Sequence, residues 1–360
     1  MKVQVHPADR WGCGYFRLIW PAQELQRRGY DVTIIEPGDD SKIGGFVTDG
    51  RLTSAIIPEG DVFVFQRPTN ILLVDLIQHL RRHGKTVVVD MDDDLSCIHP
   101  KNLAFQMLHP KNPSGNWQNA VDGCRAASLV TVSTPPLANR YAGHGRYRVL
   151  RNCVPDHYLD IPRITGQPRR WGWAGALYSH PDDVPLLGRT ANDLHRAGYP
   201  MQVVGDPEGM GRALGLAADP AATGRLGIDE WATTLSVTLD IGVAPLADTR
   251  FNLAKSWLKP LEYAALGIPW VATATPEYQL LADQVGGVAV RNKPAVWTAA
   301  VRRLLTDDAY YDELSQQVRS GAAEFTISRH AEAWWEAWQE AYRFDQSLTA
   351  PQDPWYAGAQ

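Results

Sequence analysis

Lys255, Lys259 and Glu262 are three charged residues set among apolar ones in residues 251–273, FNLAKSWLKPLEYAALGIPWVAT. At about 100° per residue they share one stripe of a helix, provided that the helix includes Lys255. Ser256 is a predicted N-cap, so free backbone N–H groups would begin this helix beside two ammonium groups. That combination can bind a diphosphate, and the carboxylate can accept hydrogen bonds from a ribose. The alternative is an exposed helix face with a Lys259–Glu262 ion pair.

Glycine-bearing strand ends in the second half of the chain could complete such a site. WGWAG ends in Gly175, VVGDP carries Gly205, and LDIGVAPL runs into the loop before residues 251–273. Ligands of open α/β sheets bind at the carboxyl ends of parallel strands, where backbone N–H groups are available. Gly205 would flank a base. The predicted ligand-binding residues are Gly175, Ala176, Gly205, Lys255, Ser256, Lys259, Leu261 and Glu262.

Asp90, Asp92, Asp93 and Asp94 follow the strand-like run KTVVV in the first half of the chain. Four neighbouring carboxylates repel one another unless hydrogen bonds, a metal ion or solvent compensates them. One interpretation is a site where Mg²⁺ or Mn²⁺ holds a diphosphate. The other is a metal-independent cluster that faces a substrate or caps a helix. The second is preferred because residues 251–273 already offer a diphosphate site, so no metal ligand is predicted.

Arg17 follows a glycine-rich turn, DRWGCGY, between the first predicted strand and the first predicted helix. It falls in the first turn of that helix, where a positive charge opposes the helix dipole. We therefore expect a specific anionic or carbonyl partner, with a solvated arginine as the alternative. His109 lies in a polar segment rich in Asn and Pro, where a surface histidine is the default.

Strand-like runs alternate with helical patterns along the chain, which predicts an α/β fold with parallel sheets. The aromatic stripe of Trp334, Trp338 and Tyr342 predicts a C-terminal helix packed on one of the domains. The predicted strands are residues 3–7, 31–37, 61–68, 85–94, 128–135, 147–154, 171–175, 201–207, 239–246, 268–273 and 286–290. The predicted organisation is a domain over 1–151, a linker over 152–170, a domain over 171–330, a helix over 331–346 and a disordered tail over 347–360.

Composition is that of a globular protein, with 360 residues, 44% hydrophobic and 21% charged. No apolar run suits a signal peptide or a membrane span, so we expect a soluble, cytoplasmic protein, or one in the host cytoplasm if a phage encodes it. Residues 1–170 hold 21 Lys and Arg against 17 Asp and Glu. This balance permits an anionic acceptor but is far from the basic stripe of a nucleic-acid-binding protein. Four scattered cysteines are expected to be reduced thiols.

The segment DIGVAPLADTRFNLAKSWLKPLEYAALGIPWVAT resembles the donor-binding motif of retaining GT-B glycosyltransferases, specifically of glycosyltransferase family 4. The similarity extends through VTVSTPPLANRY, VLRNCVPDHYL and WGWAG. It implies two Rossmann-like domains facing across a cleft, with a nucleotide sugar bound by the C-terminal one. Glu262 matches the family's ribose-binding glutamate, and the start of its helix would face the diphosphate.

The sequence departs from the family motif at two places. A second glutamate, which contacts the donor sugar in the family, is replaced by Ala254. The loop after Gly175 lacks the family's Arg and Lys ligands of the diphosphate, and Lys255 and Lys259 are inferred to supply that charge.

The resemblance also implies a role in the first half, where the loop after the first strand would face the cleft and the acceptor or the transferred sugar. One of His99 and His109, in the polar segment over the cleft, would contact the transferred sugar. No cofactor is required, although Mg²⁺ or Mn²⁺ would be used if Asp90–Asp94 bound metal. The predicted catalytic residues are Arg17, Asp92, Asp93 and His109, and the predicted acceptor loop is Gly12, Cys13, Gly14 and Tyr15.

The function that follows is transfer of a hexose from a UDP- or GDP-sugar to a hydroxyl acceptor, with retention of configuration. The compact first half resembles glycosyltransferases of bacteriophages and actinobacteria, so the acceptor would be a glycan, a protein Ser or Thr, or a hydroxymethylated DNA base. Three alternatives stay open: a GT-B epimerase of nucleotide sugars, a metal-dependent transferase, and a silent nucleotide-sugar-binding protein.

Overall fold

The computed structural model describes residues 1–37 and 45–349, and these form two compact units. Unit 1 comprises, of these residues, 1–37, 45–91, 110–150 and 331–349. Unit 2 comprises residues 92–109 and 151–330. The predicted boundaries near 151 and 330 recur in this division. Residues 92–109 and the predicted linker over 152–170, however, both belong to unit 2.

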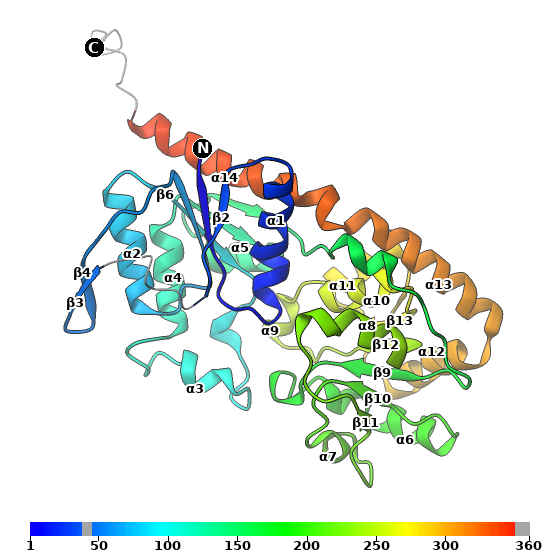
Figure 1. The fold of residues 1–360 in the computed structure, drawn as a ribbon. Helices are drawn as coiled ribbons and strands as arrows, with labels where there is room; N and C mark the ends of the chain where they lie inside the picture. The colour runs from blue at the N-terminus through cyan, green and yellow to red at the C-terminus, as the bar shows by residue number, and fades with distance from the viewer. Residues whose placement is uncertain (38–44, 350–360) are drawn as a thin grey trace, which may run out of the picture. The chain divides into compact units, whose positions relative to one another are not determined.

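Unit 1 contains a six-stranded parallel sheet in the order β2-β1-β5-β6-β7-β8 (Figure 1). Its central strands β5 and β6 are buried along their whole length, as expected for apolar runs such as VFVFQ and TVVVDM. A separate hairpin of β3 and β4 was not predicted. The strands of unit 1 are β1 Val3–His6, β2 Val32–Ile34, β3 Gly45–Thr48, β4 Arg51–Ala55, β5 Val62–Gln66, β6 Thr86–Met91, β7 Leu129–Val132 and β8 Tyr147–Val149.

Helices pack on this sheet, and the last of them is the predicted C-terminal helix. Trp334 and Trp338 are fully buried, and the Trp334 indole donates a 2.7 Å hydrogen bond to the Arg17 carbonyl. Asp345, near the end of the same helix, accepts a 2.6 Å hydrogen bond from the Ser128 hydroxyl. The aromatic stripe is therefore core packing within unit 1. The helices are η1 Tyr15–Ile19, α1 Trp20–Arg27, α2 Ile71–Arg82, α4 Trp117–Ala126, α5 Pro135–Tyr141 and α14 Ile327–Thr349, of which the part from Ala331 belongs to unit 1.

Unit 2 contains a second six-stranded parallel sheet, in the order β11-β10-β9-β12-β13-β14 (Figure 1). Counted along the unit, this is the order 3-2-1-4-5-6 of the Rossmann fold. The order reverses between β9 and β12, and that point is where ligands bind in such sheets. The strands are β9 Trp171–Ala174, β10 Gln202–Val204, β11 Ala221–Ala222, β12 Ile241–Ala244, β13 Trp270–Thr273 and β14 Val288–Val290.

Helical segments connect the strands of unit 2. The helix predicted near residues 182–198 is present as η6 followed by α6. The helical segments are η3 Leu95–Cys97, α3 Ala104–Leu108, η4 Asp156–Asp160, η5 Leu177–Ser179, η6 Val184–Leu187, α6 Gly188–Arg196, α7 Met210–Leu214, α8 Ile228–Thr238, α9 Arg250–Leu253, α10 Leu258–Ala265, α11 Pro276–Val285, α12 Pro294–Thr306, α13 Asp308–Ala322 and η7 Ala323–Phe325. No helix in the described parts of the chain has the length and apolarity that a membrane span requires.

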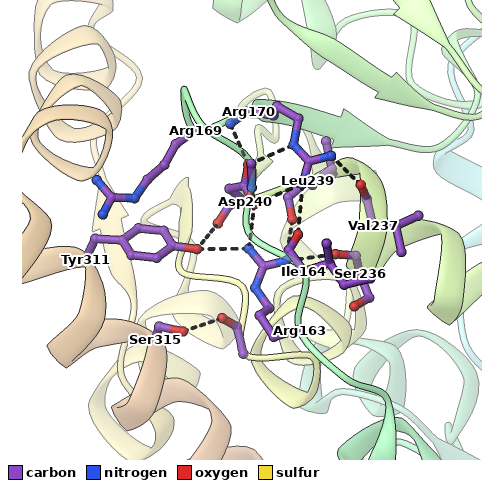
Figure 2. Close-up of polar contacts among 12 residues, drawn as sticks. Arg163, Ile164, Arg169, Arg170, Ser236, Val237, Leu239, Asp240, Tyr311 and Ser315 are labelled. Atoms are coloured by element: carbon purple, nitrogen blue, oxygen red, sulfur yellow. Dashed lines mark hydrogen bonds and ion pairs between the residues drawn. The ribbon is translucent and has the colours of Figure 1, made fainter.

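Asp240, which is fully buried before β12, fastens residues 163–170 to unit 2 (Figure 2). One carboxylate oxygen lies 2.7 Å from the Arg170 backbone nitrogen and 2.8 Å from Arg170 Nε. The other accepts hydrogen bonds from Arg163 and from the Gly166 backbone. Two charged donors and two backbone donors thus compensate this buried carboxylate. The segment predicted as a linker is therefore held along its second half.

Two smaller predictions concern the cysteines and the C-terminal tail. No disulfide joins the four cysteines, all of which lie among the described residues, so the prediction of thiols is confirmed. The predicted tail lies outside the described residues from 350 onward, while residues 347–349 end α14.

Candidate functional site

The carboxyl ends of β9 and β12 mark the switch point of the unit 2 sheet. Gly175 follows β9 directly, and Gly205 follows the neighbouring strand β10. A Cβ on Gly205 would lie 2.1 Å from the Gly175 carbonyl oxygen, and the φ angle of Gly205 is 131°. Both facts require glycine at this position. The two predicted glycines therefore form one close contact at the strand ends.

Lys259 extends from α10 to the end of β9, where its ammonium group donates a hydrogen bond to the Ala174 carbonyl oxygen. The same nitrogen lies 4.9 Å from the ring centroid of Trp173, in a cation–π arrangement. A Cβ on Gly175 would come within 3.1 Å of it. Burial, aided by the nearby Lys255, lowers the pKa of Lys259, while Glu262 opposes this effect. A partly desolvated cation thus sits at the predicted phosphate position.

Glu262 lies one turn further along α10 and is 7% exposed. Its Oε1 accepts a 2.8 Å hydrogen bond from the indole of Trp231 on α8. Burial raises the pKa of Glu262, and the Lys259 charge and the Trp231 hydrogen bond counteract part of that rise. Within residues 1–37 and 45–349, Oε2 has no hydrogen-bonding partner. This oxygen is the acceptor that could receive a ligand hydroxyl.

The predicted start of this helix is wrong. α10 begins at Leu258 with Trp257 as the N-cap, so Lys255 and Ser256 precede it. Pro260 explains the difference, because proline has no N–H and is tolerated only where that group has no intrahelical partner. With Ser256 as the N-cap, the fourth helical residue, Pro260, would have to donate the first helical hydrogen bond. In the structure Leu261 makes that bond, to Trp257, at 3.1 Å.

Lys255 therefore reaches the site from the segment between α9 and α10 and not from the helical stripe. Its ammonium group lies 2.9 Å from a carboxylate oxygen of Asp93 and 4.4 Å from the Phe251 ring centroid. Ser256 Oγ accepts a 2.8 Å hydrogen bond from Asn152. The Leu261 side chain is fully buried in the core. Lys255 and Asp93, both predicted site residues, are thus brought together, whereas Ser256 and Leu261 make structural contacts.

His180 and Asp183 form a polar pair that the sequence prediction did not include. His180 Nδ1 lies 2.8 Å from Asp183 Oδ2. Asp183 Oδ1 accepts hydrogen bonds from the Ala247 backbone at 2.7 Å and from the Asn252 side chain at 2.6 Å. The pair thus joins the loop after β9 to the loop after β12. The run SHPDD after the Gly175 turn was the available signal, since polar residues at strand ends often serve ligands.

The carboxylates of Asp90–Asp94 do not act as one cluster. Asp94 caps η3 and accepts a 2.6 Å hydrogen bond from Ser96 Oγ, as the helix-capping interpretation predicts. Asp93 pairs with Lys255, and Asp92 is 7% exposed. Asp90 lies in unit 1. In the part of the chain that the structure describes, no three His, Cys, Asp or Glu side chains are grouped to hold a metal ion.

Arg17 is fully buried in unit 1, as is its partner Asp90. The guanidinium lies 2.7 and 3.0 Å from the two Asp90 oxygens and donates to the Leu150 carbonyl. Thr131 adds a 2.6 Å hydrogen bond to Asp90. The expectation of a specific anionic and carbonyl partner is confirmed. This geometry gives Arg17 a structural role, and its catalytic role stays a prediction.

The predicted acceptor loop is organised by Asp9. One Asp9 oxygen accepts hydrogen bonds from the backbone of Trp11, Gly12 and Gly14, and the other pairs with Arg67. A Cβ on Gly14 would lie 1.9 Å from the Asp9 carbonyl, so only glycine fits there. Cys13 and Tyr15 complete the turn, and Tyr15 begins η1. The loop is thus an ordered structure at the switch point of the unit 1 sheet.

Residues 92–109 contribute two histidines to unit 2. His109 follows α3 and packs against Phe105, with 5.3 Å between the ring centroids. His99 lies 3.1 Å from Asp182 and lines a cavity of about 160 Å³ that Asn252 also lines. His109 is not among the lining residues. His99 is therefore closer to the His180–Asp183 pair than the histidine singled out from sequence.

A larger cavity, of about 710 Å³, opens beside Gly205. Tyr178 and Asp206 line it, and Tyr178 is 39% exposed. Arg225, also lining, has its guanidinium 5.8 Å from that ring centroid and 3.4 Å from Asp206. An exposed aromatic face beside an ion pair suits a planar polar group.

Neither the family models nor the curated proteins compared gave a match to this sequence. The structure is similar to Anabaena Alr3699/HepE, solved in complex with UDP, with a TM-score of 0.60 and 13% identity over 94% of this chain and 100% of that one. The N-terminal domain of Candida albicans trehalose-6-phosphate phosphatase has a TM-score of 0.60 and 9% sequence identity, over 94% of this chain and 98% of that one. AviGT4, a glycosyltransferase involved in avilamycin A biosynthesis, has a TM-score of 0.57 and 14% sequence identity, over 95% of this chain and 98% of that one.

At these identities the likeness shows the fold alone. Together with the two parallel sheets, it confirms the predicted fold class, GT-B, with two Rossmann-like units.

Proposed function

We propose that this protein is a glycosyltransferase that moves a sugar from a nucleotide diphosphate sugar to a hydroxyl acceptor. The observation that carries the proposal is the meeting of Lys259, Glu262 and the Gly175 turn at the switch point of a Rossmann-like sheet. An ammonium group and a buried carboxylate with one available oxygen are the complements of a diphosphate and a ribose. The similarity to a fold neighbour solved with UDP supports a nucleotide as part of the ligand.

In the proposed complex, Glu262 Oε2 accepts hydrogen bonds from the ribose hydroxyls. Lys259 and Lys255 bind the diphosphate, and Tyr178 and Gly205 flank the base. The diphosphate gains one negative charge when its bond to the sugar breaks. The positioned cations therefore stabilise the departing diphosphate more strongly than the diphosphate of the bound donor. Because this added stabilisation is present in the transition state, it accelerates the reaction.

We further propose a UDP- or GDP-hexose as donor and transfer with retention, from the family resemblance of residues 240–273. The acceptor is a glycan, a protein hydroxyl or a hydroxymethylated DNA base. Asp92, Asp93, Arg17 and His109 remain the predicted catalytic residues, and the Gly12–Tyr15 loop the predicted acceptor contact.

The test is a panel of UDP, GDP, TDP and their sugars, measured first by thermal stabilisation and then by titration calorimetry. One nucleotide should raise the melting temperature, because a ligand that binds only the folded state stabilises it. No stabilisation by any member of the panel would refute the proposal.

Turnover then separates the alternatives. A transferase releases nucleoside diphosphate only with acceptor, apart from slow hydrolysis, whereas an epimerase converts the donor alone. A silent binding protein would bind the donor and turn over nothing.

A further inference from the structure

His180 is fixed in one orientation although the proposed function has not yet used it. Its Nδ1 lies 2.8 Å from Asp183 Oδ2, and the other oxygen of that carboxylate accepts two further hydrogen bonds, from Ala247 and Asn252. Because a carboxylate only accepts hydrogen bonds, Nδ1 carries a proton. Nε2 is therefore the ring nitrogen whose protonation can change.

Nε2 is the ring nitrogen that remains available for a ligand. Among the described residues it has no hydrogen-bonding partner, yet it is not sealed from solvent. The imidazole packs edge-on against Trp173 with 5.5 Å between centroids, and Lys259 lies over the same indole ring at 4.9 Å. Trp173 thus holds His180 and Lys259 as neighbours at the end of β9.

Carboxylates around His180 balance the positive charges of the neighbouring lysines. Lys255 is paired with Asp93 at 2.9 Å, and the carboxylates of Glu262 and Asp183 face Lys259. Asp182 is paired with His99 at 3.1 Å. Burial is the main cause that lowers the pKa of His180 to about 4; Asp183 opposes this effect, and the charges of Lys259 and Lys255 add to it. The imidazole is therefore neutral at neutral pH before a ligand binds.

We propose that His180 is a third ligand of the donor diphosphate, to which its protonated Nε2 donates a hydrogen bond. The inference rests on the proposed function of the Lys255–Lys259 site. The bound diphosphate reverses the sign of the local field, so the imidazole takes up a proton from solvent. His180⁺ then adds the positive charge that the two compensated lysines lack.

The protonation of His180 also favours the nucleoside diphosphate product over the nucleotide-sugar donor. The departing diphosphate carries one more negative charge than the nucleotide sugar, so it holds the proton of His180 more strongly. The imidazolium therefore stabilises the leaving group beyond the bound substrate, without giving up its own proton. Asp183 is a positioning residue that keeps the ring in place.

Titration calorimetry with UDP and GDP, in pairs of buffers with different ionisation enthalpies, tests the proposal. Binding to the wild-type protein at pH 6.5 should take up a fraction of a proton. The diphosphate affinity should fall as pH rises through the raised pKa of His180 in the complex. His180→Asn should bind about tenfold more weakly at pH 6.5, the equivalent of one pKa unit, and should lose the uptake. His195→Asn, at an exposed position on α6, is the matched control and should match the wild type.

The outcomes separate the two proposals. Nucleotide binding with identical proton uptake in the wild type and His180→Asn would overturn the role of His180 and leave the donor site standing. No binding of any nucleotide would overturn the donor site and this inference with it. If His180→Asn fails to fold, ring-nitrogen NMR of the wild-type histidines decides, because one ring must become protonated on both nitrogens when UDP is added.

Discussion

Glu262 is a carboxylate that folding removes from water, and a buried carboxylate must be compensated by other groups. The Trp231 indole satisfies Oε1, and Lys259 supplies an opposite charge nearby. Reasoning from sequence found Glu262 and Lys259 because they lie three residues apart on one helix. Trp231 comes from α8 and Asp183 from the loop after β9, and no local pattern connects them to α10. Contacts of that kind depend on tertiary structure.

Replacement of Glu262 by Ala should weaken nucleotide binding by about ten- to a hundredfold, because hydrogen bonds to a charged group are lost. Calorimetric titration with the nucleotide selected from the panel measures the loss. Glu230→Ala, an exposed acidic residue on α8, controls for the change of net charge. Equal affinity of Glu262→Ala and the wild type would remove the ribose assignment.

Replacement of Arg17 by Met should lower the free energy of unfolding of unit 1 by about 3–5 kcal/mol, since it leaves Asp90 as a buried carboxylate without its cation. Urea unfolding measures this loss. Arg125→Met breaks an exposed ion pair with Asp122 and should cost about 0–1 kcal/mol. A loss in Arg17→Met as small as that of the control would contradict the structural role.

At the scale of elements, strand ends and helix starts decide where the side chains arrive. Runs such as KTVVVD and WGWAG predicted the strands well, because buried parallel strands are continuous apolar runs. Helix starts were harder to predict. The N-cap at Ser256 looked favourable by residue type, but the missing N–H of Pro260 moved the start to Leu258. Lys255 consequently reaches Asp93 from outside the helix.

Replacement of Gly205 by Ala should both destabilise unit 2 and weaken nucleotide binding. Backbone strain at positive φ costs about 1–3 kcal/mol, and the new methyl group would also press on the Gly175 carbonyl. Thermal unfolding and calorimetry report the two effects. Gly198 also has a positive φ, but a Cβ there would meet open space. Gly198→Ala therefore measures the cost of backbone strain without the steric clash. Equal effects of both variants would show that the close contact is unimportant.

Replacement of Asp240 by Asn should release residues 163–170 from unit 2 and cost about 3–5 kcal/mol, because two arginines lose a buried carboxylate. Trypsin should then cleave after Arg163 and Arg170 faster than in the wild type. Asp193→Asn, which removes an exposed ion pair on α6, should not change the cleavage pattern. Unchanged cleavage in Asp240→Asn would mean that other contacts suffice to hold the segment.

At the scale of the whole molecule, two similar sheets carry different side chains at their switch points. In unit 2 the strands end in glycines, and α10 brings Lys259 and the buried Glu262 to them, whereas in unit 1 the first strand ends in a loop organised by Asp9 and Arg67. The alternation of strands and helices was enough to predict this architecture. The hairpin of β3 and β4 was not predicted, since it is short and largely exposed and carries little of the pattern of a buried strand.

Glycosyl transfer should continue in EDTA, because we propose that side-chain cations, and no divalent ion, hold the diphosphate. An assay of nucleotide release with donor and acceptor, with and without added Mg²⁺ or Mn²⁺, measures this independence. Loss of activity in EDTA that Mn²⁺ restores would instead favour the metal-dependent alternative.

The assignment of residues 92–109 to unit 2 affects how this protein can be recombined with others. A hybrid made to exchange the proposed donor site would join the first half of one protein to the second half of another. A junction at residue 151 would take Lys255 into the hybrid and leave Asp93, 2.9 Å from it, behind. Lys255 would then lie beside whatever residue the other protein has in place of Asp93, and it would lose its ion pair unless that residue is also acidic. A faithful transplant needs two exchanged segments, 92–109 as well as 151–330.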